Sequence, residues 1–204
     1  MDYPYGMVYL VLTTFPVLRE QKYHESVGTG SLNHISLALG CFLGSQLSAA
    51  LNDRIYIRLK KRNNNNNTEY PEFCVAPMVP GALLVPAGLF IYGWSARYET
   101  HWVAPNIGPV IYCAGTIVNF RCVQIYLVDT YQRYAASALA SVTVLRSLAG
   151  FGFPLFAPYM YDRLGFGWGN SMLGFLAIVL GLPAPFLLWR YGERLRARST
   201  FAAA

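Results

Sequence analysis

The segment Tyr126–Phe156, YLVDTYQRYAASALASVTVLRSLAGFGFPLF, contains the features that decide the fold of this chain. It begins with a polar stretch at 129–133, continues through a run of alanine and serine residues, and then reaches a single cation, Arg146. Small side chains let helix backbones approach closely in a bilayer, where packing drives helix association. A charge inside an apolar run is costly in lipid and usually faces a protein-lined cavity. The pattern is typical of a transport helix.

The composition of the whole chain agrees with this interpretation. Of the 204 residues, 54% are hydrophobic and only 13% are charged, and the mean hydropathy is +0.32. A soluble globular domain carries about 25% charged residues. The 12 prolines and 18 glycines lie mostly within apolar runs, as is common in membrane helices. The sequence therefore predicts an integral, all-α membrane protein.

Six segments are predicted to cross the membrane, because a spanning helix needs about 20 mainly apolar residues. We expect one domain, residues 1–204, that forms a six-helix transmembrane bundle. In the second segment, Gly40 and Gly44 are spaced so that they form one small-residue face. The stretch 52–76, basic and then rich in asparagine, is predicted to be a loop outside the lipid. The predicted spans are 3–18, 32–51, 77–94, 103–128, 135–159 and 168–191.

The distribution of cations predicts the orientation of these spans. Arg54, Arg58, Lys60, Lys61, Arg62, Arg133, Arg190, Arg194, Arg196 and Arg198 would lie on one side, and Arg19, Lys22, Arg97 and Arg163 on the other. The positive-inside rule then places both termini and the 52–76 loop in the cytosol, with the plasma membrane as the expected location. The sequon Asn66-Asn67-Thr68 would stay unmodified there. The net charge of +6 is thus a topology signal, and no nucleic-acid partner is expected.

Motifs for catalysis, metals or cofactors are not found in the sequence. The four cysteines lack the paired spacing of a metal site. There is no Ser-His-Asp set, paired catalytic carboxylates, HExxH or glycine-rich phosphate loop. We therefore expect no cofactor and no enzymatic activity.

Arg146 is the strongest candidate for a functional residue. It lies about eleven residues into its predicted span, too far from the helix end for its side chain to reach water by snorkelling. One interpretation is that it acts in a cavity on a solute or in a proton-coupled step. The other is a structural salt bridge, or a hydrogen bond to carbonyls in a broken helix.

Polar residues in two other spans are further candidates. Arg121 and Gln124 in the fourth span are spaced to pair on one helix face, whereas Asn119 sits apart from Gln124. These three can line a cavity or serve as interhelical hydrogen-bond partners, and the latter use is common in membranes. Gln46 lies deep in the second span and has the same two interpretations.

Ordered motifs over nearly the whole chain carry a family resemblance. They are Tyr5–Leu10, Thr13–Pro16, Asn52–Arg54, Gly81–Leu84, Gly88–Trp94, Tyr126–Asp129, Tyr134–Ala138, Leu145–Leu148, Pro154–Phe156, Gly167–Ser171 and Tyr191–Arg196. They resemble the C-terminal half of fungal major facilitator superfamily (MFS) transporters of the drug:proton antiporter type, which export drugs and polyamines. The resemblance implies one of two pseudo-symmetric halves around a central cavity. The resemblance further implies a partner for this bundle, an N-terminal six-helix half that lies outside the given sequence.

The resemblance also implies roles for particular residues. Spans one, two, four and five would line the cavity, which favours Asn119, Gln124 and Arg146. Asp53 and Arg54 would belong to a loop that latches the conformations, although Ala49 and Tyr56 stand where the family motif has glycines.

The predicted function is transport of small organic solutes or drugs across a lipid bilayer, as proton-coupled efflux. The alternative is a non-transporting scaffold, partner subunit or inactive fragment. An intramembrane enzyme is a distant third, because the sequence has no catalytic constellation.

Overall fold

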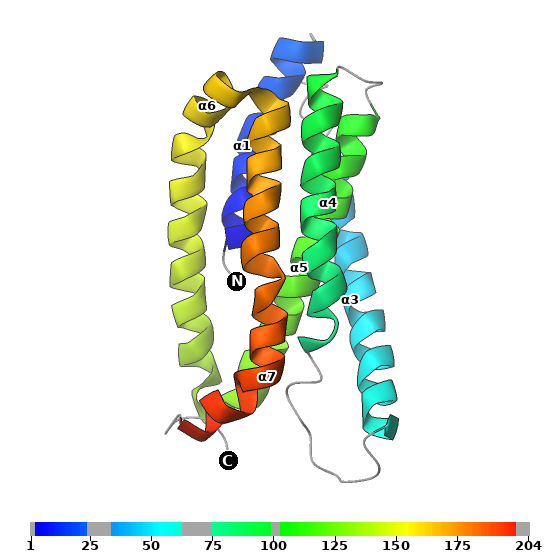
Figure 1. The fold of residues 1–204 in the computed structure, drawn as a ribbon, viewed down its shortest axis with the longest axis vertical. Helices are drawn as coiled ribbons and strands as arrows, with labels where there is room; N and C mark the ends of the chain where they lie inside the picture. Colours follow the sequence, from blue (N-terminus) through cyan, green and yellow to red (C-terminus); the bar gives the residue numbers. More distant parts are fainter. Residues whose placement is uncertain (1–2, 24–33, 63–74, 99–102, 199–204) are drawn as a thin grey trace.

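The computed structural model describes residues 3–23, 34–62, 75–98 and 103–198, and all statements about the structure refer to these ranges. Long helices run up and down alongside one another and form a single bundle (Figure 1). No strand occurs in the described ranges. The elements are α1 (Tyr3–Tyr23), α3 (Ile35–Arg62), α4 (Met78–Arg97), α5 (Ala104–Thr130), the 3-10 helix η2 (Gln132–Tyr134), α6 (Ala135–Gly181) and α7 (Pro183–Arg198).

The predicted all-α membrane fold is confirmed. Among the described residues, four helical segments are long and apolar enough to cross a membrane: Ile35–Ile55, Met78–Arg97, Ala104–Thr130 and Gln132–Gly192. The last of these has 61 residues and includes both predicted spans 135–159 and 168–191. The count of six spans stays a prediction.

The chain reverses direction inside α6, at Gly165. This residue has φ 70° and ψ 170°, a backbone conformation that is open almost only to glycine. Figure 1 shows the first part of α6 running along the bundle to one end and the second part returning beside α1 and α4. The reversal falls between the predicted spans 135–159 and 168–191.

Buried polar side chains brace this reversal. The hydroxyl of Tyr161 donates a hydrogen bond to Oδ1 of Asn170 (3.1 Å), and Nδ2 of Asn170 donates to the carbonyl of Phe166 (2.9 Å). The rings of Tyr161 and Phe166 are stacked, with centroids 4.8 Å apart. Since Asn170 has no exposed surface, its polar atoms depend on these bonds.

Glycines bring the helix backbones of the bundle into direct contact. A Cβ atom added to Gly88 of α4 would lie 2.5 Å from the backbone nitrogen of Tyr112 in α5. On α3, a Cβ at Gly40 or at Gly44 would each lie 2.7 Å from backbone atoms of α5, at Val110 and Ala114. The predicted small-residue face of Gly40 and Gly44 therefore packs on α5, as expected for helices associating in lipid.

Large buried side chains fill the space between α1, α4 and α5. Met7 and Leu10 of α1, Tyr92 of α4 and Tyr112 of α5 are at most 1% exposed. The hydroxyl of Tyr112 donates a 2.6 Å hydrogen bond to the carbonyl of Pro4. This bond ties the first turn of α1 to the first third of α5 and so fixes the two helices that carry Tyr5 and Phe120.

The basic stretch at the start of the predicted 52–76 loop is helical, which corrects the prediction. Helix α3 continues through residues 52–62 and ends at Arg62. The stretch has no glycine or proline and contains leucine, lysine and arginine, which are good helix formers. A helix satisfies its own backbone hydrogen bonds, so it can continue past the apolar segment. Residues 63–74 lie outside the described ranges.

Candidate functional site

A cavity of about 390 Å³ lies between α1, α3, α5 and α6, and we call it the Arg146 cavity. Volumes of about 300–1,000 Å³ are usual for sites that bind small molecules. Its wall is mainly apolar and aromatic, and Arg146 is the only arginine, lysine or carboxylate among the described residues that line it. The lining residues are Tyr5, Val8, Tyr9 and Leu12 of α1, Cys41 of α3, Cys113, Thr116, Ile117 and Phe120 of α5, and Arg146 of α6.

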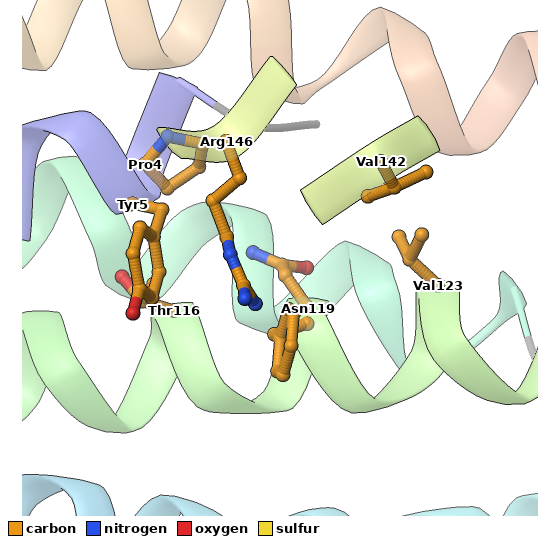
Figure 2. A pocket seen from close by; sticks show the side chains of 8 residues that line it. Pro4, Tyr5, Thr116, Asn119, Val123, Val142 and Arg146 are labelled. Carbon is orange, nitrogen blue, oxygen red and sulfur yellow. The ribbon is translucent and has the colours of Figure 1, made fainter. Parts of the chain in front are cut away.

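A smaller hollow of about 20 Å³ is lined by some of the same residues (Figure 2). Tyr5, Thr116, Phe120 and Arg146 line both spaces, and the hollow adds Asn119. Figure 2 shows the Arg146 side chain reaching from α6 toward α5, with Tyr5 on one side and the Asn119 amide on the other. The hollow is too small for an organic solute, so we treat it as an extension of the Arg146 cavity.

Aromatic rings hold the guanidinium of Arg146. Its Cζ atom lies 4.5 Å from the ring centroid of Tyr5 and 4.9 Å from that of Phe120, within the range of cation–π interactions. Arg146 is half-buried, and among the described residues no carboxylate pairs with it. The predicted structural salt bridge is therefore not formed within this part of the chain.

Tyr5 connects the charged and apolar parts of the wall. Its ring packs edge-on against Tyr9, one turn along α1, with centroids 5.2 Å apart and planes at 65°. It also lies 6.5 Å from the ring of Phe120 across the helix interface. Edge-to-face and offset arrangements are the favoured geometries of aromatic pairs. The wall beside Arg146 is thus aromatic on both α1 and α5.

Asn119 is the second polar side chain in this region. It is 6% exposed, and its Oδ1 atom is buried with no hydrogen-bond donor in the described ranges. A Cβ at Gly81 of α4 would lie 2.8 Å from that oxygen, so a larger residue at position 81 would require the amide to shift. A buried amide acceptor without a partner costs free energy, about 1–3 kcal/mol.

The remaining predicted residues lie outside the Arg146 cavity. Gln124 is half-buried on α5, and Arg121 on the same helix is exposed. Gln46 is on an exposed face of α3. The structure thus brings together Arg146 and Asn119 but places Gln124, Arg121 and Gln46 elsewhere. As cavity residues, these three stay predictions.

The two residues of the predicted latch lie within a helix. Asp53 and Arg54 are exposed near the C-terminal end of α3, in the part that was predicted to be a loop. Their role as a latch stays a prediction.

Comparison with known proteins places the chain among transporters. It is 50% identical to the efflux pump vrtL of Penicillium aethiopicum over 203 residues, which cover all of this chain and 40% of the pump. It is 48% identical to the MFS-type transporter oryF of Aspergillus oryzae over 98% of the chain and 41% of that protein. An uncharacterized transporter of Schizosaccharomyces pombe is 45% identical over 98% of the chain and 40% of its own length.

Over almost its whole length, the chain is similar to fungal MFS-type transporters. It spans about two fifths of the length of these relatives and so corresponds to part of such a transporter. The family resemblance drawn from the sequence motifs is confirmed. No family model and no solved structure matches the chain.

Reasoning from the sequence missed the aromatic wall of the cavity. Tyr5 and Tyr9 are four residues apart, and Cys113, Thr116 and Phe120 are spaced by three and four, so each set shares one helix face. Spacing alone could therefore have grouped them. What it could not show is that these faces meet across α1 and α5 beside Arg146, since that depends on helix packing.

Proposed function

We propose that this chain is the membrane-embedded part of a transporter that exports small organic solutes, with the Arg146 cavity on the solute pathway. The observation that carries the proposal is the half-buried guanidinium of Arg146, which faces a cavity and contacts only aromatic rings among the described residues. A charged side chain inside a membrane is energetically costly, and such residues usually line a substrate pathway or pair with another polar group. The similarity to proteins named as efflux pumps and MFS-type transporters supports the same function.

The rest of the solute pathway would be formed by a second bundle, which corresponds to the region of the relatives that this chain does not cover. We propose that an N-terminal six-helix half packs against this bundle and that the two rock to expose the cavity to either side. The scaffold alternative is not favoured, because the relatives are named as transporters and efflux pumps.

Protons are the proposed coupling ion, as the family resemblance implies. The residues that line the Arg146 cavity include no carboxylate and no histidine within the described ranges. We therefore propose that the proton-binding group belongs to the missing half and that Arg146 contacts the solute. The proposed location is the plasma membrane with both termini in the cytosol, supported by the excess of cations around 52–62 and in the C-terminal tail.

A complementation experiment tests this function. The chain is co-expressed with the N-terminal portion of the efflux pump vrtL in yeast that lacks its main drug exporters, and the loss of preloaded fluorescent solutes is measured. We expect co-expression to accelerate the loss. Arg146→Gln should abolish this acceleration, and Arg163→Gln, which removes an exposed cation at the Gly165 turn, should keep it. Equal loss with and without the chain over a solute panel would contradict the proposal.

A further inference from the structure

We propose that the Arg146 cavity selects planar aromatic anions, such as aromatic carboxylates, over cations and neutral compounds of the same shape. The inference rests on the proposed function, because it takes the cavity to be a solute-binding site. Beyond that function, the inference assigns the charge and the shape of the solute.

The preference for a negatively charged solute follows from the polar residues that line the cavity. Among the described residues, Arg146 is the only lysine, arginine, aspartate or glutamate that lines the cavity or the adjoining hollow. A cation such as a polyamine would meet repulsion from Arg146 and find no carboxylate to bind. An anion would instead gain a charge-assisted hydrogen bond to the guanidinium.

The donors of Arg146 are available for such a bond. Its contacts to Tyr5 and Phe120 are cation–π contacts, which leave the N–H groups of the guanidinium without an acceptor. Among the described residues the guanidinium forms no hydrogen bond. Its planar fork of five N–H donors matches a carboxylate in a two-bond arrangement. Figure 2 shows the end of this side chain in the space between Tyr5 and Asn119.

The aromatic preference follows from the wall beside the guanidinium. Tyr5, Tyr9 and Phe120 line one cavity with Arg146, and their rings lie 5.2 Å and 6.5 Å from centroid to centroid. A flat ring can pack offset or edge-on against them while its carboxylate reaches Arg146. The volume of about 390 Å³ accommodates a solute of two fused rings with a short substituent.

Binding of three matched compounds to the purified 204-residue chain tests the inference. The compounds are 2-naphthoate, 2-naphthamide and 2-naphthylmethylammonium, which share a ring system and differ in charge. Their affinities are measured by equilibrium dialysis of the chain in lipid nanodiscs. We expect 2-naphthoate to bind about tenfold more tightly than the amide, with the ammonium compound weakest. Equal affinities, or tighter binding of the ammonium compound, would overturn the inference.

Variants locate the selectivity at Arg146. Arg146→Gln should lower the affinity for 2-naphthoate to the level of the affinity for 2-naphthamide. The affinity for 2-naphthamide itself should stay unchanged, and this unchanged binding shows that the variant is folded. Arg146→Lys keeps the charge and should keep a reduced preference for the anion, so it serves as the test if the glutamine variant does not fold. Phe120→Leu should lower the affinities for all three compounds to a similar extent, and Arg163→Gln should leave all three affinities unchanged. An anion preference that survives Arg146→Gln, or that is lost in Arg146→Lys, would overturn the inference.

This binding experiment separates the inference from the proposed function. A chain that prefers the anion in nanodiscs but does not support solute loss in the complementation experiment contradicts the transport proposal alone. A chain that supports solute loss but binds the three compounds equally contradicts the charge selectivity alone.

Discussion

At the scale of single residues, Arg146 shows how an arginine is kept inside an apolar bundle. Cation–π contacts are worth about 0.5–2 kcal/mol each, and the guanidinium has two of them, to Tyr5 and Phe120. That is less than the cost of removing a charge from water, which is several kcal/mol for a buried ion. The side chain is half-buried and borders a cavity, so part of its hydration can be retained. The sequence predicted the position of Arg146 in its span, but not the rings around it.

The hydrogen bond between Tyr161 and Asn170 offers a test of the buried polar network. We expect Tyr161→Phe to lower the free energy of unfolding by about 1 kcal/mol, because Oδ1 of the fully buried Asn170 loses its donor. Tyr159→Phe removes a hydroxyl from a side chain that is 75% exposed and should have no measurable effect. Unfolding titrations in mixed micelles measure both variants. Equal effects of the two substitutions would show that the network does not stabilise the turn.

At the scale of helices, the apolar runs of the sequence predicted the positions of the helices, but they predicted the residues at which the helices end less accurately. The segment predicted at 103–128 is α5, Ala104–Thr130, and the segment predicted at 77–94 is α4, Met78–Arg97. Helix α3 extends eleven residues beyond the predicted end at 51, to Arg62. Hydropathy reports where lipid contact ends, whereas a helix ends only where its backbone bonding stops. The basic stretch is polar but still a good helix former, which explains the difference.

The contact between α4 and α5 gives a prediction for helix packing. We expect Gly88→Ala to lower the free energy of unfolding by about 1–3 kcal/mol, because the new methyl group would meet backbone atoms of Tyr112 and Gly108 at 2.5–2.7 Å. Gly152→Ala in α6 is the matched control, since a Cβ there has no neighbour within 4 Å. It should be neutral or slightly stabilising, because alanine favours helix over glycine. Thermal unfolding in detergent compares the two variants, and a Gly88→Ala protein as stable as the parent would contradict the close packing.

The reversal at Gly165 gives a prediction of a different physical kind. A Cβ at this position has no neighbour within 4 Å, so Gly165→Ala introduces no clash. The φ of 70° and ψ of 170° are nevertheless unfavourable for alanine, and we expect a loss of stability of about 1–3 kcal/mol. The same detergent unfolding measurement applies. If Gly165→Ala behaved like Gly152→Ala, the turn would not require the backbone conformation seen here.

At the scale of the whole molecule, the sequence predicted the family and the fold class, but only part of the site. Ordered motifs along the chain were enough to indicate the family because they recur across spans, and the relatives confirm it. Of the polar residues that the sequence singled out inside the spans, Arg146 and Asn119 meet at one hollow, whereas Arg121 and Gln46 lie on exposed faces. Which face of a helix points inward depends on its neighbours, and hydropathy does not report it.

The orientation in the membrane can be tested with the sequon at Asn66. We expect the parent chain to stay unglycosylated in microsomes, because the positive-inside rule places residues 52–76 in the cytosol. His24→Asn creates a sequon with Glu25 and Ser26 in the connection between α1 and α3. That connection is predicted on the opposite side, so this variant should gain a glycan, seen as a shift on a gel. A glycan on Asn66 of the parent chain would reverse the predicted topology.

The access of a water-soluble thiol reagent to position 146 in a lipid membrane tests directly whether Arg146 borders a solute cavity. The four cysteines are replaced by alanine, and Arg146→Cys and Leu148→Cys are compared, since Leu148 is 63% exposed on the outer surface of α6. If position 146 faces a hydrated cavity and position 148 faces lipid, a charged methanethiosulfonate should modify the thiol at 146 much faster. Equal rates at the two positions, or faster reaction at 148, would contradict a solute cavity built around Arg146.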